Sequence, residues 1–243
     1  MPPVNLYTTP IYLPGPVVGG KANLPVVSTV QAVQTNPTTF ENSNDVLTLG
    51  QPTLTHYSAQ FGFTNADQNT GLDLQMVLQS HLTQLEKSVQ AAINAQITEA
   101  NFAAATVTVT SGNWAVANFE ALRAAVPSAT AVCLAADYFV KTKSTWMPAG
   151  TEGTLRELSD LTGIGSGIKG FVARPEALAL VIGYPTPGPV GEVTVSKINL
   201  PVGIPVQFSR WWQRGGRSWR GSLDIVLGVE VGQPGALRLL KTA

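Results

Sequence analysis

Hydrophobic residues recur at intervals of three or four between residues 71 and 100, the spacing that places them on one face of a helix. The residues of this stripe are Leu78, Leu82, Leu85, Val89, Ile93, Ile97 and Ala100. Glutamine and other polar side chains fill the opposite face, and Thr70 and Asp73 have the spacing of a capping box. The pattern predicts one unusually long helix, about 45 Å at 1.5 Å per residue.

Apolar and polar positions instead alternate between residues 54 and 63, where threonine and aromatic residues favour a strand. The apolar run Val46–Leu49 precedes this stretch, and the intervening Gly50-Gln51-Pro52 is a turn signal. Together these features predict a two-stranded hairpin over residues 46–66. Its apolar face is thin, so the hairpin cannot be stable without a partner.

Residues 1–45 combine prolines with many apolar side chains. Prolines stand at positions 2, 3, 10, 14, 16, 25 and 37, which excludes a helix and restricts any strand to a sheet edge. Leucine, isoleucine, valine and tyrosine are too frequent here for an ordinary disordered tail. We expect an extended arm that lies on a partner, and a frayed terminus is the alternative.

Residues 105–243 carry short apolar runs of both strand and helix type. The expected strands cover residues 106–110, 129–135, 171–173, 190–200, 206–212, 223–231 and 237–240. The expected helices cover residues 111–126, 154–161 and 177–182, and Pro175 stands at the start of the last one. Because these elements do not alternate regularly, the pattern favours an α+β fold over a doubly wound sheet.

The composition favours association between copies of the chain. Its 243 residues are 44% hydrophobic and 12% charged, with zero net charge, whereas a typical soluble domain has about 25% charged residues. A neutral chain with so few charges tends to associate and is a poor candidate for a basic nucleic-acid-binding protein. Residues 1–100 carry 2 basic and 6 acidic side chains, and residues 101–243 carry 13 and 9, so the two parts have opposite net charge.

The sequence offers no clear catalytic, cofactor-binding or metal-binding group. His56 and His81 lack a metal-ligand spacing, and no Gly-x-Ser-x-Gly motif is present. Residues 165–170 match Gly-x-Gly-x-x-Gly, but that motif needs a strand before it and a helix after it. Here a helical pattern precedes and a strand pattern follows, so we predict a loop. We expect no enzyme activity, no cofactor and no metal site.

A single cysteine and the absence of long apolar runs exclude further classes of protein. Cys133 excludes an internal disulfide and a cysteine-based zinc site, and its apolar neighbours predict that it is buried. No apolar run approaches the ~18 residues of a membrane span. The N-terminus lacks the basic start and unbroken apolar core of a secretory signal, so we expect the chain to stay in the compartment where it is made.

Arginine and tryptophan gather between residues 210 and 220, which hold four arginines and three tryptophans. Such a cluster can stack on bases and bind phosphates, but Gly215-Gly216 between two strand-like runs predicts a hairpin. The tryptophans would then pair across the strands while the arginines project outward. Because both residue types are enriched at protein interfaces, we interpret the cluster as an interface or structural hairpin rather than a nucleic-acid site.

The order of these elements resembles that of one protein family. A proline-rich arm, a projecting hairpin, a long lone helix and an α+β remainder are similar, over nearly the whole chain, to the Hong Kong 97-type major capsid proteins of tailed double-stranded DNA bacteriophages. Looser similarities lie near the C-terminus, where Pro-x-Ala begins at Pro175, Gly-x-Pro-Val at Gly203 and Asp-x-x-x-Gly at Asp224.

The resemblance implies an α+β capsid fold with the following parts. Residues 1–45 would be the N-terminal arm, 46–69 the E-loop hairpin, 70–113 the spine helix with a peripheral-domain strand, 114–190 mainly the axial domain, and 191–243 returning strands of both domains. Some family members link subunits through a lysine on the E-loop. Residues 46–69 contain no lysine, so we do not expect that cross-link.

The resemblance also implies a function and partners. The protein would be made in the host bacterial cytoplasm and would assemble, as pentamers and hexamers, into the icosahedral shell of a virion. Its expected partners are copies of itself, a separate scaffolding protein, a portal, a decoration or cement protein, and packaged double-stranded DNA contacted non-specifically; no membrane is expected. Deleting residues 1–40 is predicted to leave a folded chain that forms no closed particles.

Subunit contacts are expected at apolar and cationic residues of the arm, the hairpin and the Arg/Trp cluster. These residues are Leu6, Tyr7, Ile11, Tyr12, Tyr57, Phe61, Phe63, Arg210, Trp211, Arg214 and Arg217. Three alternatives stay open: an encapsulin-type nanocompartment shell, an enzyme for a small ligand that uses the loop at residues 163–170, and a nucleic-acid-binding module at residues 210–220.

Overall fold

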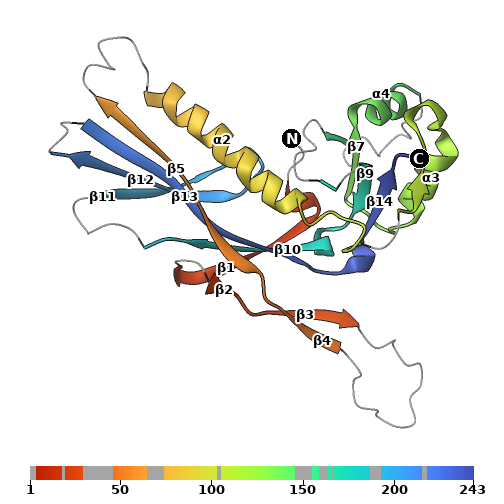
Figure 1. The fold of residues 1–243 in the computed structure, drawn as a ribbon, viewed down its shortest axis with the longest axis horizontal. Coiled ribbons are helices and arrows are strands. Elements are labelled where there is room, and N and C mark those ends of the chain that lie inside the picture. The colour runs from red at the N-terminus through yellow and green to blue at the C-terminus, as the bar shows by residue number, and fades with distance from the viewer. Residues whose placement is uncertain are drawn as a thin grey trace, which may run out of the picture.

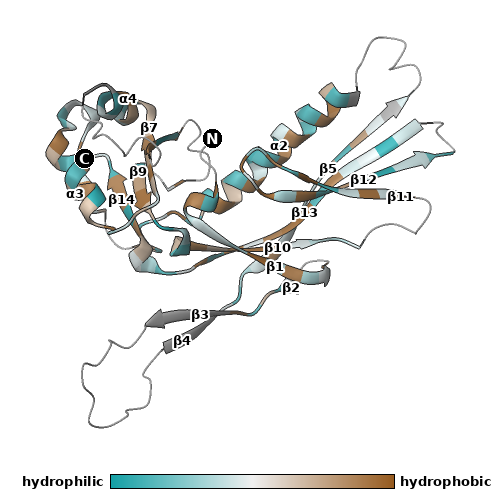
Figure 2. Ribbon diagram, turned by 180° about the vertical axis from the view of Figure 1, so that it is seen from behind, coloured by the Kyte–Doolittle hydropathy of each residue, from teal (hydrophilic) through white to brown (hydrophobic). Residues whose placement is uncertain are grey.

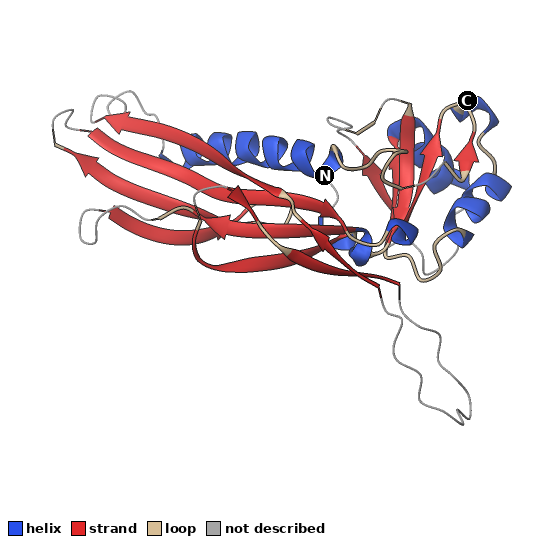
Figure 3. Ribbon diagram, turned by 60° about the horizontal axis from the view of Figure 1, so that its bottom comes forward, coloured by secondary structure: helices blue, strands red, loops and turns tan. Residues whose placement is uncertain are grey.

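The fold consists of a long sheet covered by one helix, a smaller sheet with two helices beside it, and a two-stranded ribbon that projects from the body (Figure 1). This computed structural model describes residues 4–17, 20–29, 46–64, 74–102, 105–145, 155–158, 164–165, 167–186, 193–214 and 218–243. Figure 3 shows the two sheets side by side, and the chain passes between them after α2, between β9 and β10, and between β13 and β14.

The long sheet is built around one central strand. Its members are β1 (Thr8–Pro16), β2 (Gly20–Lys21), β5 (Thr53–Thr64), β10 (Leu178–Tyr184), β11 (Val193–Asn199), β12 (Pro205–Gln213) and β13 (Ser218–Val231). The order is β1-β10-β13-β12-β11, and β5 also pairs with β13 while β2 pairs with β5. Only the β1–β10 pairing is parallel. Every residue of β13 from Gly221 to Gly228 is buried, as expected for a central strand.

The predicted long helix is present as α2 (Leu74–Asn94), which packs against β5 and β13. Leu85, Val89 and Ile93 of its apolar stripe are buried, and Leu78 and Leu82 are partly buried against the same core. Ile97 is also buried, although it lies past the end of the helix. The sequence periodicity therefore identified the correct face, and the helix is shorter than the stripe.

The smaller sheet has the order β6-β14-β9-β7-β8. Its strands are β6 (Val107–Thr108), β7 (Ala131–Ala135), β8 (Leu155–Leu158), β9 (Ile168–Ala173) and β14 (Leu237–Lys241), and its helices are α3 (Val116–Ala124) and α4 (Ala136–Thr145). Single 3₁₀ turns lie at η1 (Val4–Leu6), η2 (Ser111–Asn113), η3 (Pro175–Ala177) and η4 (Pro234–Ala236).

Both faces of this smaller sheet are buried. Cys133 of β7 belongs to the core shared with α2, whereas Val132 and Leu134 belong to a second core with Trp114 and Phe119. All five residues of β7 are consequently buried. The first core is continuous with that of the long sheet, so the two sheets share one hydrophobic interior.

The predicted hairpin over residues 46–66 is wrong in its pairing. Both of its strands exist, as β4 (Val46–Gly50) and β5, but β4 pairs with β3 (Leu24–Thr29) and not with β5. The ribbon of β3 and β4 projects away from both sheets, as Figure 1 shows. The turn at Gly50 therefore leads from the ribbon into the long sheet, where β5 finds its partner β13.

The described part of residues 1–45 is not a free arm. Residues 8–16 form the edge strand β1, which agrees with the prediction that prolines confine any strand here to an edge. Just before it, the Tyr7 carbonyl accepts a hydrogen bond from the Leu178 N–H, and the Leu6 carbonyl accepts one from the Thr130 hydroxyl. The start of the chain is thus anchored to both sheets.

Two predicted helices are strands. Residues 155–158, within the expected helix 154–161, form β8, and residues 178–184, which include most of the expected helix 177–182, form β10. Six of the seven residues of β10 are buried, so both faces are apolar and no period of two is visible. The structure also adds α4, which the sequence did not predict, and shortens the helix expected at 111–126 to α3. The capping box at Thr70 and Asp73 lies outside the described residues.

Candidate interaction surfaces

The Arg/Trp cluster lies on the hairpin of β12 and β13, as predicted. Gln213 pairs with Ser218 at its end, and Trp212 lies directly opposite Trp219. The two indole rings meet edge to face with centroids 5.3 Å apart, an arrangement that aromatic pairs favour. They remain 40% and 39% exposed, so the hairpin presents a large apolar surface to solvent.

Arginine side chains frame these rings. The Arg210 guanidinium lies 5.0 Å from the centre of the Trp219 ring, close enough for a cation–π contact. The Arg220 Nε donates a hydrogen bond to the Gln213 Oε1 at 2.7 Å. Arg214 is exposed at the end of β12. We call residues 210, 212, 214, 219 and 220 the Arg/Trp tip; its arrangement is cationic, aromatic and open to solvent.

The other predicted contact residues lie in different environments. Ile11 and Tyr12 on β1 are 37% and 54% exposed. Leu6, Tyr57 and Phe61 are partly buried against their own core, and Phe61 stacks on His81 of α2 with ring centroids 5.2 Å apart. Trp211 is half-buried on β12. The side chain of Phe63 and the whole of Arg217 lie outside the description.

Tyr7 is a core residue and not a surface contact. It is fully buried, its ring meets Phe171 edge to face at 5.3 Å, and its hydroxyl is 2.6 Å from the Gln90 carboxamide nitrogen. Gln90 also donates to Asn94 at 2.9 Å, so a buried polar chain runs along α2. Burial raises the pKa of the Tyr7 hydroxyl, which stays neutral. Its position between β9 and α2 corrects the prediction that it contacts a neighbouring subunit.

The titratable side chains do not form a catalytic arrangement among the described residues. The His56 Nε2 lies 2.9 Å from the Asp224 carboxylate. Ser58 lies opposite Asp224 on β5, but no hydrogen bond among the described residues joins its hydroxyl to this imidazole. Cys133 is fully buried, and burial raises the pKa of its thiol to about 12, so the reactive thiolate is scarce at neutral pH. Within the described ranges, no three His, Cys, Asp or Glu side chains are grouped to hold a metal ion. No described helix is long and apolar enough to cross a membrane.

The glycine motif at residues 165–170 lies in a different context from the one predicted. The nearest described element before it is the strand β8, not a helix, and β9 begins at Ile168 within the motif itself. Gly165 donates a backbone hydrogen bond to Ile97, and Gly170 approaches β7 so closely that a Cβ would lie 2.6 Å from the Cys133 carbonyl oxygen. A close approach between strands explains Gly170 without any phosphate ligand.

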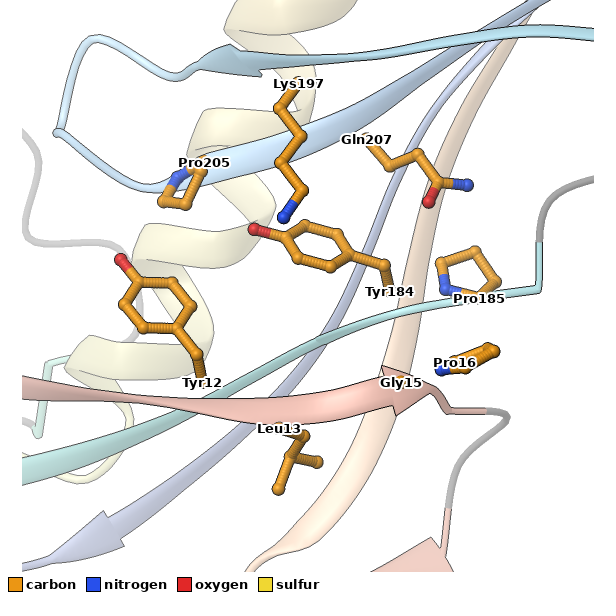
Figure 4. A pocket seen from close by; sticks show the side chains of 9 residues that line it. All are labelled: Tyr12, Leu13, Gly15, Pro16, Tyr184, Pro185, Lys197, Pro205 and Gln207. Atoms are coloured by element: carbon orange, nitrogen blue, oxygen red, sulfur yellow. The ribbon is translucent and has the colours of Figure 1, made fainter.

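Sequence reasoning missed a groove between β1, the end of β10 and the start of β12. Its volume is about 470 Å³, and Figure 4 shows the nine residues that line it. These are Tyr12, Leu13, Gly15, Pro16, Tyr184, Pro185, Lys197, Pro205 and Gln207. The sequence indicates it only weakly: Tyr12 lies between Pro10 and Pro14 in β1, and Tyr184 at the end of β10 is followed by Pro185.

Comparison of the whole structure with known proteins identifies the fold. The chain is similar to the asymmetric unit of the bacteriophage PhiM1 mature capsid, with a TM-score of 0.57 and 12% identity over 99% of this chain and 86% of that chain. It is similar to the capsid of a native GTA particle, with a TM-score of 0.56 and 10% identity over 99% and 90% of the two chains. The chain has the Hong Kong 97-type capsid fold.

This capsid fold confirms the predicted fold class, including its α+β character. A virus-like particle from Pyrococcus furiosus is also similar, with a TM-score of 0.53 and 13% identity over 98% of this chain and 90% of that chain. No protein-family model and no curated protein matches the sequence. The Hong Kong 97-type fold is thus recognisable here in three dimensions at identities where sequence comparison finds nothing.

Proposed function

We propose that this protein is the major structural subunit of a capsid shell that encloses phage DNA. The observation that carries the proposal is the similarity of nearly the whole chain to subunits of assembled phage capsids. Its low charge content and zero net charge support a surface that is covered by other copies. The chemistry of the described residues supports no competing catalytic role, and the protein would act by assembly and not as an enzyme.

We assign the family's parts to the structure differently from the sequence expectation. The long sheet with α2 is the peripheral domain, and the smaller sheet with α3 and α4 is the axial domain. The projecting ribbon of β3 and β4 takes the role of the E-loop in place of residues 46–69, because β5 belongs to the long sheet. In this assignment residues 8–16 belong to the peripheral domain as its edge strand β1 and not to a free arm.

The Arg/Trp tip is the subunit contact that the geometry supports best. It lies at the far end of the long sheet from the axial domain, where Figure 1 shows β12 and β13 extending beyond the core. Exposed tryptophans and arginines are the side chains that most often anchor interfaces. Ile11 on the β1 edge, which is 37% exposed, provides a second, smaller apolar surface.

The energy of assembly would come from many weak contacts. Each contact buries apolar area worth about 25 cal/mol per Å², and ordering a backbone segment costs about 1–2 kcal/mol per residue. Single contacts are therefore marginal, and a closed shell stabilises them together. A separate scaffolding protein, a portal and packaged DNA are the partners we propose for this role, a decoration or cement protein is an optional one, and the virion is its location.

Electron microscopy of the purified protein tests this function directly. We expect closed shells, or rings of five and six subunits. Replacing Trp212 and Trp219 together with alanine is expected to keep the fold but abolish closed particles. The matched control is Val140→Ala on α4, which is 60% exposed and lies beside the smaller sheet, at the other end of the molecule from the Arg/Trp tip (Figure 1). A monomer that never assembles, even with a scaffolding protein, would contradict the proposal.

Removing residues 1–40 is not a clean assembly test. The deletion takes away β1 and Tyr7, which the chain needs for its own core. Loss of particles would then report unfolding. The double tryptophan variant avoids this problem because both side chains are substantially exposed.

A shell for another cargo is the second candidate. The similarity to the virus-like particle from Pyrococcus furiosus favours it, because that particle is of the same fold. The content of purified particles separates the two candidates. Double-stranded DNA protected from nuclease supports a phage capsid, and an enclosed protein without DNA supports a nanocompartment.

A further inference from the structure

The groove of Figure 4 exists because β13 changes partner along its length. It pairs with β12 as far as Asp224, which lies opposite Gln207, and with β10 from Val226, which lies opposite Gly183. The end of β10 and the start of β12 therefore approach the same edge of β13 at neighbouring residues, and the two strands diverge from each other there. The groove occupies this fork, and it is a built feature of the sheet and not a gap in a loop.

Aromatic and proline side chains form the groove's apolar walls. Tyr12 on β1 and Tyr184 on β10 contribute rings, and Pro16, Pro185 and Pro205 surround them. Gly15 adopts a positive φ of 81°, where β1 makes the irregular step between Tyr12 and Pro16. A residue with a side chain would be strained in that conformation, so this glycine shapes the groove's rim.

Three polar groups in the groove can bond to a ligand and orient it. The Lys197 ammonium lies 4.5 Å from the centre of the Tyr184 ring, in a cation–π contact. Gln207 is only 6% exposed, yet among the described residues its side chain makes one hydrogen bond, a long one of 3.5 Å to Ser209. Burial raises the pKa of the Tyr184 hydroxyl, which therefore remains a donor at neutral pH. A buried, under-partnered amide in a groove favours a ligand that bonds to it.

We propose that this groove binds an extended, proline-rich peptide segment with an acidic residue, supplied by another protein. Paired aromatic rings with nearby donors are the recognition surface for polyproline II helices, whose carbonyls point outward and are free to accept hydrogen bonds. Lys197 is the only charged side chain among the nine lining residues, and charge complementarity selects an acidic residue in the ligand. The proposal goes beyond shell formation and does not depend on it.

Fluorescence anisotropy with labelled peptides on the full-length protein tests the groove. The probes are a peptide of repeating Pro-Pro-Glu, one of repeating Pro-Pro-Lys and one of repeating Ser-Ser-Glu. We expect the Pro-Pro-Glu peptide to bind best. Absence of binding, or equal binding of the serine peptide, would overturn the proposal. Binding to the free chain that disappears in assembled particles would assign the groove to a neighbouring copy and also overturn it.

Two variants connect binding to the groove. Tyr12→Ala removes an exposed ring, so the fold should survive, and it should weaken binding roughly threefold to tenfold. Lys197→Glu should reverse the preference, so that the Pro-Pro-Lys peptide binds better than the Pro-Pro-Glu peptide. The matched controls are Met76→Ala and Lys87→Glu on α2, whose side chains are exposed and do not line the groove. Unchanged binding in both groove variants would refute the assignment.

Discussion

The two sheets of this molecule differ in how completely their faces are buried. The smaller sheet buries both faces, one against α3 and α4 and the other against the core shared with α2. The long sheet covers one face with α2, whereas its other face carries buried polar residues such as Asp224 beside a small apolar cluster that includes Val181 and Val226. In Figure 2 the far end of β12 is white to teal, and hydrophobic colour is frequent where the two sheets meet.

This difference separates two tasks within one chain. The smaller sheet buries both of its faces within this chain, so its sequence reads as continuous apolar runs. The long sheet leaves exposed aromatic and cationic groups, including Trp212 and Trp219, that gain burial only from another molecule. We therefore place two of the proposed recognition surfaces, the Arg/Trp tip and the groove, on the long sheet.

The largest effect is expected where the two sheets share their core. Tyr7→Ala should lower the free energy of unfolding by about 3–5 kcal/mol, because it removes a fully buried ring that contacts Phe171. Urea unfolding followed by circular dichroism measures this loss. Tyr7→Phe keeps the ring but removes the partner of Gln90, and should cost about 1–3 kcal/mol. Two separate unfolding transitions in the wild type would break the idea of one shared interior.

A somewhat smaller effect is expected inside the smaller sheet. In Gly170→Ala the new methyl group would lie 2.6 Å from the Cys133 carbonyl oxygen, and backbone cannot move aside cheaply. We expect a loss of about 2–3 kcal/mol and faster alkylation of the buried Cys133 thiol, whose accessibility reports opening of this sheet. Gly235→Ala is the control, since no atom lies within 4 Å of its added methyl group. Equal effects of the two variants would contradict the close approach.

The outer core of the smaller sheet offers a milder test. The Trp114 indole donates a hydrogen bond of 2.9 Å to the Thr142 hydroxyl and packs on Tyr138. Trp114→Phe should cost about 1–2 kcal/mol, because a buried hydroxyl loses its donor. Thermal unfolding measures the loss, and particle assembly should be unaffected. An assembly defect in this variant would contradict the proposal that subunit contacts lie on the long sheet and not on the smaller one.

The smallest effect is expected at the ion pair between Lys241 in β14 and Glu99, which follows α2. The Lys241 ammonium lies 2.7 Å from the Glu99 carboxylate, and this hydrogen bond lowers the pKa of Glu99. The pair therefore stabilises the fold above the ordinary glutamate pKa of about 4.3, and that contribution is lost as the pH falls through the lower folded-state pKa. Lys241→Met should cause a slight, salt-sensitive loss of stability near neutral pH. A difference from wild type that grows on acidification would have the wrong sign.

Several elements were predictable because their burial pattern is local. The stripe through Leu85 and Val89 identified the buried face of α2, and alternation identified β5. The Gly215-Gly216 signal placed the β12–β13 hairpin and the facing Trp212 and Trp219. Contact residues on this hairpin could be proposed because arginine and tryptophan are enriched at protein interfaces.

Other elements could not be predicted, for a physical reason in each case. Residues 178–184 are apolar on both faces, so a buried strand and a buried helix segment give the same pattern. Tyr7 looked like a surface anchor because prolines around it indicate an extended chain, which says nothing about what the chain packs on. The groove depends on where β13 exchanges partners, and no short-range signal encodes that position.

The sequence by itself determined the class of this protein: a long amphipathic helix, many short strands, a low charge content, and an aromatic–cationic hairpin. These properties are local sums over side chains, so order along the chain is enough to read them. Only the tertiary structure decided that β4 pairs with β3, that Tyr7 belongs to the core, and that Tyr12, Tyr184 and Gln207 meet in one groove. Strand partners are chosen by burial and hydrogen bonding between distant segments, and that choice becomes visible only when the whole chain is folded.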